Sequence, residues 1–307
     1  MRHGLWLVGE GEQCHAHTAP APIFIPVNIT GFHVSLKLCI LDPLSPEVLS
    51  DVLQSLEAWG PAVGEAIHVD LDVYVHASKQ EAVSELEALP WTRGTLRFHY
   101  YDAEHRVDLP TTWIPGTGTE FGIFLGEALT PSSWSWLKSA LFHYFLSSNL
   151  DDRLAGFSLS RNSLGLFPTI PTAIEQASDP YFLFPEAGDA VTVFFPNHWG
   201  NFVAWNRENS AFLEARMQGR STMQLHQLWK LFARTTGLHM LHLNPNSGMP
   251  SLTAKFEEIT ASAHQESTPH QDTRWTFPLL STLPRSNTQG QLLQGKDRLL
   301  RFLHEQR

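Results

Sequence analysis

The sequence predicts an α/β protein whose mainly parallel sheet is covered by helices on both faces. Segments with apolar residues at every second position alternate along the chain with segments at helical spacing. Such alternation produces parallel strands joined by right-handed crossovers. The 307 residues, 42% of them hydrophobic, are also enough to bury a large core. Parallel sheets of this kind bind ligands at the carboxyl ends of their strands.

The first five predicted elements alternate as strand, helix, strand, helix and strand. After a strand over 34–41, Ser45, Pro46 and Glu47 provide an N-cap, a proline at the first helical position and an early acid, and Gly60 ends the helix. The next three elements are a period-two strand over 69–75, a Glu-rich helix over 80–89 and a strand over 96–100.

The alternation continues to residue 243. We predict strands over 121–125, 154–159, 191–195 and 238–243, and helices after Thr130, from Pro196 and over 221–236. Four prolines between residues 161 and 185 predict a long surface loop. The predicted organisation is a loose leader over 1–22, a single domain over 23–260, and a polar tail over 261–307 with a short helix near 296–304.

Charge and hydropathy exclude several classes of partner. The chain has 31 acidic and 21 basic side chains, and its formal net charge of −10 opposes non-specific binding to nucleic acid or an anionic membrane. No run approaches the roughly 20 apolar residues of a membrane span. The first apolar stretch stops short of the roughly 7–15 residues of a secretory signal. We expect a soluble domain that faces the cytoplasm or an organelle lumen.

Asp70 and Asp72 are two positions apart in the predicted strand over 69–75, so their side chains share one face. Two carboxylates on one face have the chemistry to chelate a divalent metal. We favour the simpler interpretation that they line an exposed face or a strand end, because such carboxylates are only probabilistic markers of a site.

The 16 histidines do not form a zinc pattern. His239 and His242 are three positions apart, so on a strand they point to opposite faces and do not share an ion. Structural zinc needs four convergent ligands. The GxSxG, HExxH, GxxxxGK[ST] and GxGxxG motifs are also absent, which removes the signatures of hydrolases, zincins, P-loop proteins and dinucleotide-binding enzymes.

Tryptophan rings can stack on sugars, but at helical spacing they are more often core residues. This core interpretation applies to Trp134, Trp136, Trp205 and Trp229. Trp199 is the exception, because it follows Phe-Pro-Asn-His at a strand-to-helix corner.

Four segments of the chain match, in order, the motifs of a known family. They are FGIFLGEALTPSSWSWLK (121–138), LAGFSL (154–159), DAVTVFFPNHW (189–199) and WKLFARTTGLHMLHLNPN (229–246). The order resembles that of family two-like glycosyltransferases of the GT-A class. In that family an acidic strand end and a Ser-Pro helix precede a GxSL strand, a Phe-Pro-x-x-Trp turn and a final helix and strand. The resemblance extends over roughly residues 34–250.

This resemblance implies a GT-A fold that holds a nucleotide-sugar donor against the sheet and transfers the sugar to a hydroxyl acceptor. It also implies Mn²⁺ or Mg²⁺ bridging the donor diphosphate, and a carboxylate base for the acceptor hydroxyl. The residues assigned on this basis are Glu127 and Asp189 for catalysis, Asp70, Asp72 and Glu127 for the donor, Glu127 for the metal, and His198 and Trp199 for the acceptor.

The chain departs from the family at the acidic cluster. That position reads Leu125-Gly126-Glu127-Ala128, which retains one carboxylate. Mg²⁺ and Mn²⁺ usually need more than one anionic oxygen or a phosphate already in place. The later histidine region of the family is replaced by residues 251–255, SLTAK. The aspartates at 70 and 72 correspond to the second strand and do not restore the cluster.

Two functions from different classes follow. The first is an active glycosyltransferase that works without a metal or holds one between Glu127 and the donor phosphates. The second is a catalytically inactive GT-A-like domain that binds a glycan, a nucleotide or a protein, and the small residues Gly126 and Ala128 motivate it. An α/β protein unrelated to this family is the third interpretation.

Overall fold

The computed structural model describes residues 32–39, 46–59, 67–101, 113–116, 118, 120–146, 152–159, 179–188, 191–216, 225–244, 249, 251–254, 256, 275–286 and 292–293. The predicted leader over 1–22, the predicted helix near 296–304 and the candidate base Asp189 lie outside them.

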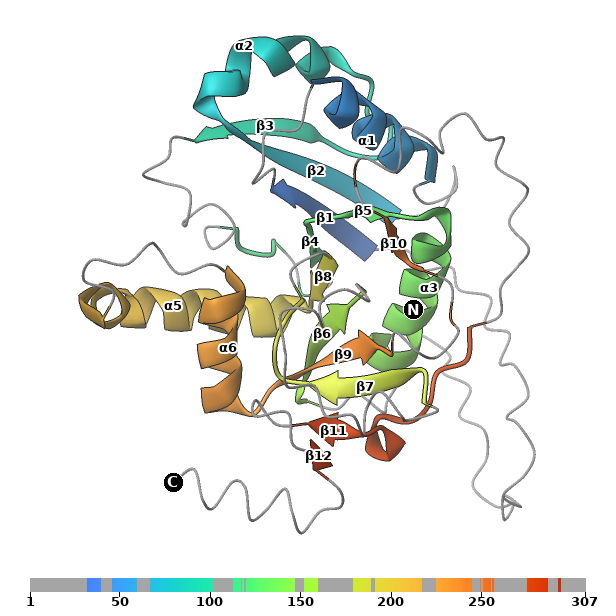
Figure 1. Ribbon diagram of the computed structural model, residues 1–307, viewed down its shortest axis with the longest axis vertical. Helices are drawn as coiled ribbons and strands as arrows, with labels where there is room; N and C mark the ends of the chain where they lie inside the picture. The colour runs from blue at the N-terminus through green and yellow to red at the C-terminus, as the bar shows by residue number, and fades with distance from the viewer. Residues whose placement is uncertain are drawn as a thin grey trace, which may run out of the picture.

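The described strands form a ten-stranded sheet in the order β12-β11-β7-β9-β6-β8-β4-β1-β2-β3. In Figure 1, β3 lies near the top of the sheet and β12 near the bottom. The strands are β1 (Phe32–Cys39), β2 (Ile67–His76), β3 (Leu96–Tyr101), β4 (Glu120–Leu125), β6 (Leu154–Ser158), β7 (Tyr181–Phe184), β8 (Val191–Phe194), β9 (His239–Leu243), β11 (Arg285–Ser286) and β12 (Leu292–Leu293). A small second sheet pairs β5 (Ala128–Leu129) with β10 (Thr253–Ala254).

The sheet is mixed, which corrects the expectation of a mainly parallel one. Its first part is parallel as predicted, because β1 pairs in parallel with β2 and β4, and β2 with β3. Strand β8 then runs antiparallel to both of its neighbours, β4 and β6, and β7 runs antiparallel to β9. A local hydrophobic pattern predicts that a strand exists, but its direction depends on the connection that brings it to the sheet.

Helices cover both faces of the sheet, as the alternation predicts. Helices α1 (Pro46–Trp59) and α3 (Pro131–Leu141) pack on one face, and α5 (Pro196–Arg216) and α6 (Leu225–Thr236) pack on the other. The shorter turns are η1 (Ala77–Lys79), α2 (Gln80–Val83), η2 (Ser84–Ala88), the π-helical η4 (Phe142–Leu146) and η6 (Leu280–Thr282). No helix in the described ranges has both the length and the apolar composition needed to cross a bilayer.

Two predicted helix boundaries are confirmed, the start of α3 and the end of α6. Helix α3 begins at Pro131, and the backbone N–H of Thr130 donates a 2.8 Å hydrogen bond to Ser133 Oγ. Helix α6 ends before Gly237, whose φ of +70° is the left-handed conformation that favours glycine. The Gly237 N–H closes the last turn by donating to the carbonyl oxygen of Ala233 at 2.9 Å.

Strand β7 corrects the prediction of an unbroken loop over 161–185. All four residues of Tyr181–Phe184 are buried and pair with β9. Pro180 and Pro185 flank the strand rather than interrupt it, so neither removes a hydrogen-bond donor from within its four residues. The number of prolines in a segment therefore does not exclude a short strand between two of them.

The predicted polar tail is also corrected, because part of residues 261–307 belongs to the folded core. Strand β11 pairs in parallel with β7, and the ring of Phe277 stacks against Tyr181 and His143 with centroid distances of 5.8 and 5.5 Å. The hydroxyl of Tyr144 donates to the carbonyl oxygen of Pro278 at 2.9 Å. A few apolar residues attach this segment to the main core, namely Trp275, Phe277, Leu280 and Leu283.

We expect Phe277→Ala to lower the free energy of unfolding by about 2 kcal/mol, because it removes a half-buried ring from contacts with four aromatic side chains. Urea denaturation measures the change. Leu279→Ala is the matched control, since that nearby side chain is 53% exposed, and it should alter stability by less than about 0.5 kcal/mol. Equal effects of the two substitutions would contradict an anchoring role for Phe277.

Candidate functional site

The strand order of the sheet reverses beside β1. From β1 the chain proceeds outward to β2 and β3, and it then returns to the other side of β1 as β4. In open α/β sheets ligands bind outside the carboxyl ends of the strands at such a switch point. The carboxyl ends of β1 and β4 therefore define the candidate functional site.

Glu127 lies at this edge. Strand β4 ends at the buried Leu125, Gly126 is exposed, and Glu127 is half-buried just before Ala128 begins β5. This position suits a side chain that meets a ligand, because the strand below it is fixed in the core and the turn itself reaches solvent. The catalytic, donor-binding and metal-binding roles of Glu127 stay predictions.

Asp70 and Asp72 share one face of β2, as predicted, since both carboxylates contact the guanidinium of Arg97. They are 7% and 2% exposed, so they do not line an exposed face. Both also precede the end of β2 at His76, so they do not mark a strand end. The simpler sequence interpretation is thus corrected, because neighbouring side chains on β3 cover the two carboxylates. Their role in donor binding stays a prediction.

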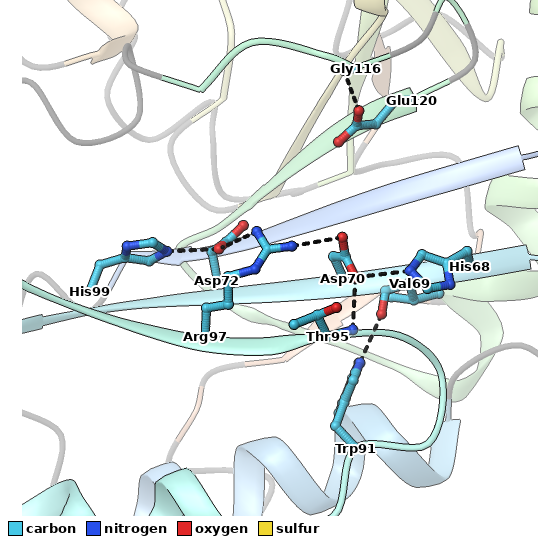
Figure 2. Close-up of polar contacts among 10 residues, drawn as sticks. All are labelled: His68, Val69, Asp70, Asp72, Trp91, Thr95, Arg97, His99, Gly116 and Glu120. Atoms are coloured by element: carbon cyan, nitrogen blue, oxygen red, sulfur yellow. Dashed lines mark hydrogen bonds and ion pairs between the residues drawn. The ribbon is translucent and has the colours of Figure 1, made fainter.

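A chain of polar contacts accounts for the burial of the two aspartates (Figure 2). Arg97 lies between them and contacts Asp70 Oδ2 at 3.0 Å and Asp72 Oδ1 at 3.3 Å. His99 Nε2 lies 2.7 Å from Asp72 Oδ1, and His68 Nε2 lies 3.0 Å from Asp70 Oδ1. The backbone N–H of Thr95 donates to Asp70 Oδ1 at 2.7 Å. The carboxylates are thus engaged by protein donors and a cation.

The described residues do not fit a resident divalent metal. No group of three His, Cys, Asp or Glu side chains among them has the arrangement to hold an ion. Glu127 is the single acid in the turn after β4, and Asp70 and Asp72 are bonded to Arg97.

The two predicted acceptor residues lie at the start of α5 and differ in exposure. Trp199 is completely buried, and its Nε1 donates to the carbonyl oxygen of Trp113 at 2.8 Å. Its ring packs against Phe124 and Phe194, so it has no face open to an acceptor, which corrects the expectation of a stacking platform. His198 is half-buried, and burial lowers its pKa while the carboxylate of Asp152 opposes that shift.

A second polar cluster, which no sequence pattern predicts, lies between β9 and α6. Glu186, two residues after β7, is 2% exposed and forms an ion pair with Lys230 of α6. Its backbone carbonyl accepts a 2.8 Å hydrogen bond from Nε2 of the buried His242. Burial raises the pKa of the Glu186 carboxyl, and its hydrogen bond and charge interaction with Lys230 oppose this rise. The cluster keeps a carboxylate inside the protein by pairing it.

Lys230→Met tests this pairing through the pH dependence of stability. We expect a loss of about 1–3 kcal/mol at pH 7, because the substitution removes the hydrogen-bonded cation of a buried carboxylate and leaves it with the charge interaction of Arg234. The folded-state pKa of Glu186 already lies above its ordinary value, and losing Lys230 raises this pKa further. As the pH falls, Glu186 is therefore protonated in the folded variant before it is protonated in the folded wild type. The difference between variant and wild type should therefore shrink as the pH falls through the pKa of Glu186. Urea denaturation between pH 7 and pH 5 measures it.

Lys79→Met serves as the control, because Lys79 is exposed at the end of η1. It should change stability by less than about 0.5 kcal/mol at every pH. A loss in Lys230→Met that stays constant with pH would contradict the assignment to Glu186.

The fold and its edge define a mixed α/β protein with a candidate ligand site at a strand switch point. Residues 48–208, more than half of the chain, match the family described as SPBC1E8.03c C-terminal domain, and the chain belongs to this family. The match begins within α1, includes β4 and ends within α5. The description names a domain and not an activity.

No curated protein matches the sequence. Among solved structures, the apo form of mouse xyloside xylosyltransferase 1 is similar over 67% of this chain and 82% of that chain, with 10% sequence identity and a TM-score of 0.33. At that score the likeness does not establish a common fold.

Proposed function

We propose that this protein is a glycosyltransferase that moves a sugar from a nucleotide-sugar donor to a hydroxyl acceptor at the carboxyl edge of β1 and β4. The observation that carries this proposal is the position of Glu127, a half-buried carboxylate in the turn directly after β4 and beside the switch point. An acid at this edge is available to a ligand, whereas Asp70 and Asp72 are bonded within the sheet.

The segments that resemble GT-A glycosyltransferases support the proposal by their arrangement. They form β4, β6, β8 and β9, which lie next to one another in the sheet in the order β4-β8-β6-β9. Segments that are separated by up to about 100 residues in the sequence thus build one continuous surface. A shared ligand site is one reason for four separate motifs to meet in this way.

In the proposed reaction the acceptor oxygen forms a bond to the anomeric carbon while the bond from that carbon to the donor phosphate breaks. The nucleoside phosphate leaves with the bonding electrons, and the hydroxyl proton passes to a carboxylate. Glu127 and Asp189 are the carboxylates that we propose for this proton transfer, a role that typically contributes about 10²–10⁴-fold to the rate.

A catalytically inactive domain that binds a nucleotide, a glycan or a protein is the second candidate function. A specific observation favours it: Glu127 is flanked by Gly126 and Ala128, so the turn after β4 offers a single acid. One carboxylate can contact a ligand without forming a divalent-metal site, which usually needs more than one anionic oxygen.

The test is release of nucleoside phosphate from a panel of nucleotide sugars, with Mn²⁺ and with EDTA. We expect turnover with at least one donor, and we expect Glu127→Gln to lower kcat/KM by about 100-fold or more. Glu85→Gln is the control, because Glu85 is exposed on η2, and it should retain wild-type turnover.

Thermal shifts with the same donors separate the two candidates. A donor-dependent rise in Tm without turnover would support the binding domain and contradict the enzyme. If no donor produces either turnover or a rise in Tm, both the transferase and a nucleotide-binding role are contradicted.

A further inference from the structure

Two buried polar atoms on neighbouring strands have no hydrogen-bond partner among the residues that the structure describes. They are Ser158 Oγ, at the end of β6, and His242 Nδ1, on β9. Both side chains are at least 99% buried. Ser158 and His242 are register partners in a parallel pair, so they point to the same face of the sheet.

The other nitrogen of His242 fixes the chemistry of this pair. His242 Nε2 lies 2.8 Å from the carbonyl oxygen of Glu186. A carbonyl oxygen only accepts, so Nε2 carries the hydrogen. Burial lowers the pKa of His242 to about 4, so the ring is neutral at pH 7 and Nδ1 presents a lone pair. The ring is held in place by stacking on Phe182 at 5.2 Å.

The energetic cost of two unmet polar atoms points to a bound group. A buried atom without a partner costs about 1–3 kcal/mol, and native proteins leave few of them. Adjacent strands lie about 4.8 Å apart, so one oxygen atom between the two side chains can reach both. We propose that Ser158 and His242 form a buried subsite for a single hydroxyl oxygen, which accepts from Ser158 Oγ–H and donates to His242 Nδ1.

The two side chains select a neutral hydroxyl over other groups. An ionised carboxylate or phosphate oxygen has no hydrogen to donate to Nδ1. A cation such as an ammonium would lose its hydration here without gaining an opposite charge, because both side chains are neutral and buried. A divalent metal needs more than one neutral nitrogen and one hydroxyl. The shared chemistry is therefore that of a water molecule or of one hydroxyl group of a ligand.

The position of the subsite allows either source. In register, Ser158 lies beside Thr192 of β8, which lies beside Phe124 of β4. The two strand spacings between β4 and β6 amount to about 10 Å, a span that a nucleotide sugar bound at Glu127 can cover. The ligand source rests on the proposed function, whereas the water source does not.

Ser158→Ala tests the subsite, because it removes the hydroxyl and leaves almost the same volume. If a water occupies the subsite, the substitution breaks its bond and should lower the Tm of the unliganded protein by about 1–3 °C. If a ligand hydroxyl occupies it, the unliganded Tm should not fall, but the Tm rise produced by a nucleotide sugar should be smaller than in the wild type.

Thr192→Val is the matched control, because the Thr192 hydroxyl already donates to the carbonyl oxygen of Gly188 at 2.7 Å. It should lower the Tm but leave the ¹⁵N resonance of His242 Nδ1 unchanged, whereas Ser158→Ala should move that resonance in the occupied subsite. A Tm of Ser158→Ala that is equal to or above wild type, with identical responses to every nucleotide sugar and an unmoved resonance, would overturn the proposal. The unliganded arm and the resonance remain decisive even if no nucleotide sugar binds.

Discussion

Strand β8 holds the two halves of the sheet together, and its fit depends on a glycine in the neighbouring strand. It pairs with β4 on one side and with β6 on the other, and all four of its residues are buried. A Cβ atom on Gly156 of β6 would lie 1.9 Å from the carbonyl oxygen of Val193. Val193 belongs to the core under α1 and α3, and Phe194 to the core under α5 and α6. Both cores and the candidate site therefore depend on this close approach.

The elements of the fold could be predicted where the signal is local. The period-two stretch around Val73 and the capping residues around Pro131 act within a few positions, so the sequence displays them directly. The direction of β8 and the addition of β11 depend on partners far along the chain. The Glu-rich helix over 80–89 is present only as the short α2 and the 3₁₀ turn η2. Helical periodicity does not distinguish these tighter turns from one continuous helix.

The candidate site likewise contains features that follow from local sequence and features that depend on contacts between distant segments. The shared face of Asp70 and Asp72 follows from their spacing, and Glu127 from its place after a predicted strand. Arg97, which binds both aspartates, is on another strand, and its register with Asp72 appears only in the folded sheet. The spacing of His239 and His242 predicts that they do not share an ion. The contact of His242 with Glu186 and its place beside Ser158 could not be predicted, because both depend on segments far apart in the sequence. The strand-to-helix corner predicts that Trp199 is open to an acceptor, but its ring lies within an aromatic core.

The pairing of β11 with β7 has a consequence for the order in which the protein is completed. Arg285 contacts a strand residue, Leu183, that precedes it by about 100 residues. During synthesis, the edge of β7 that pairs with β11 therefore has no partner until residue 285 has left the ribosome. Unpaired edges of apolar strands are sites of intermolecular association. An exposed β7 edge is thus a feature of the incomplete chain alone, because the complete sheet pairs β7 with β9 on one side and with β11 on the other.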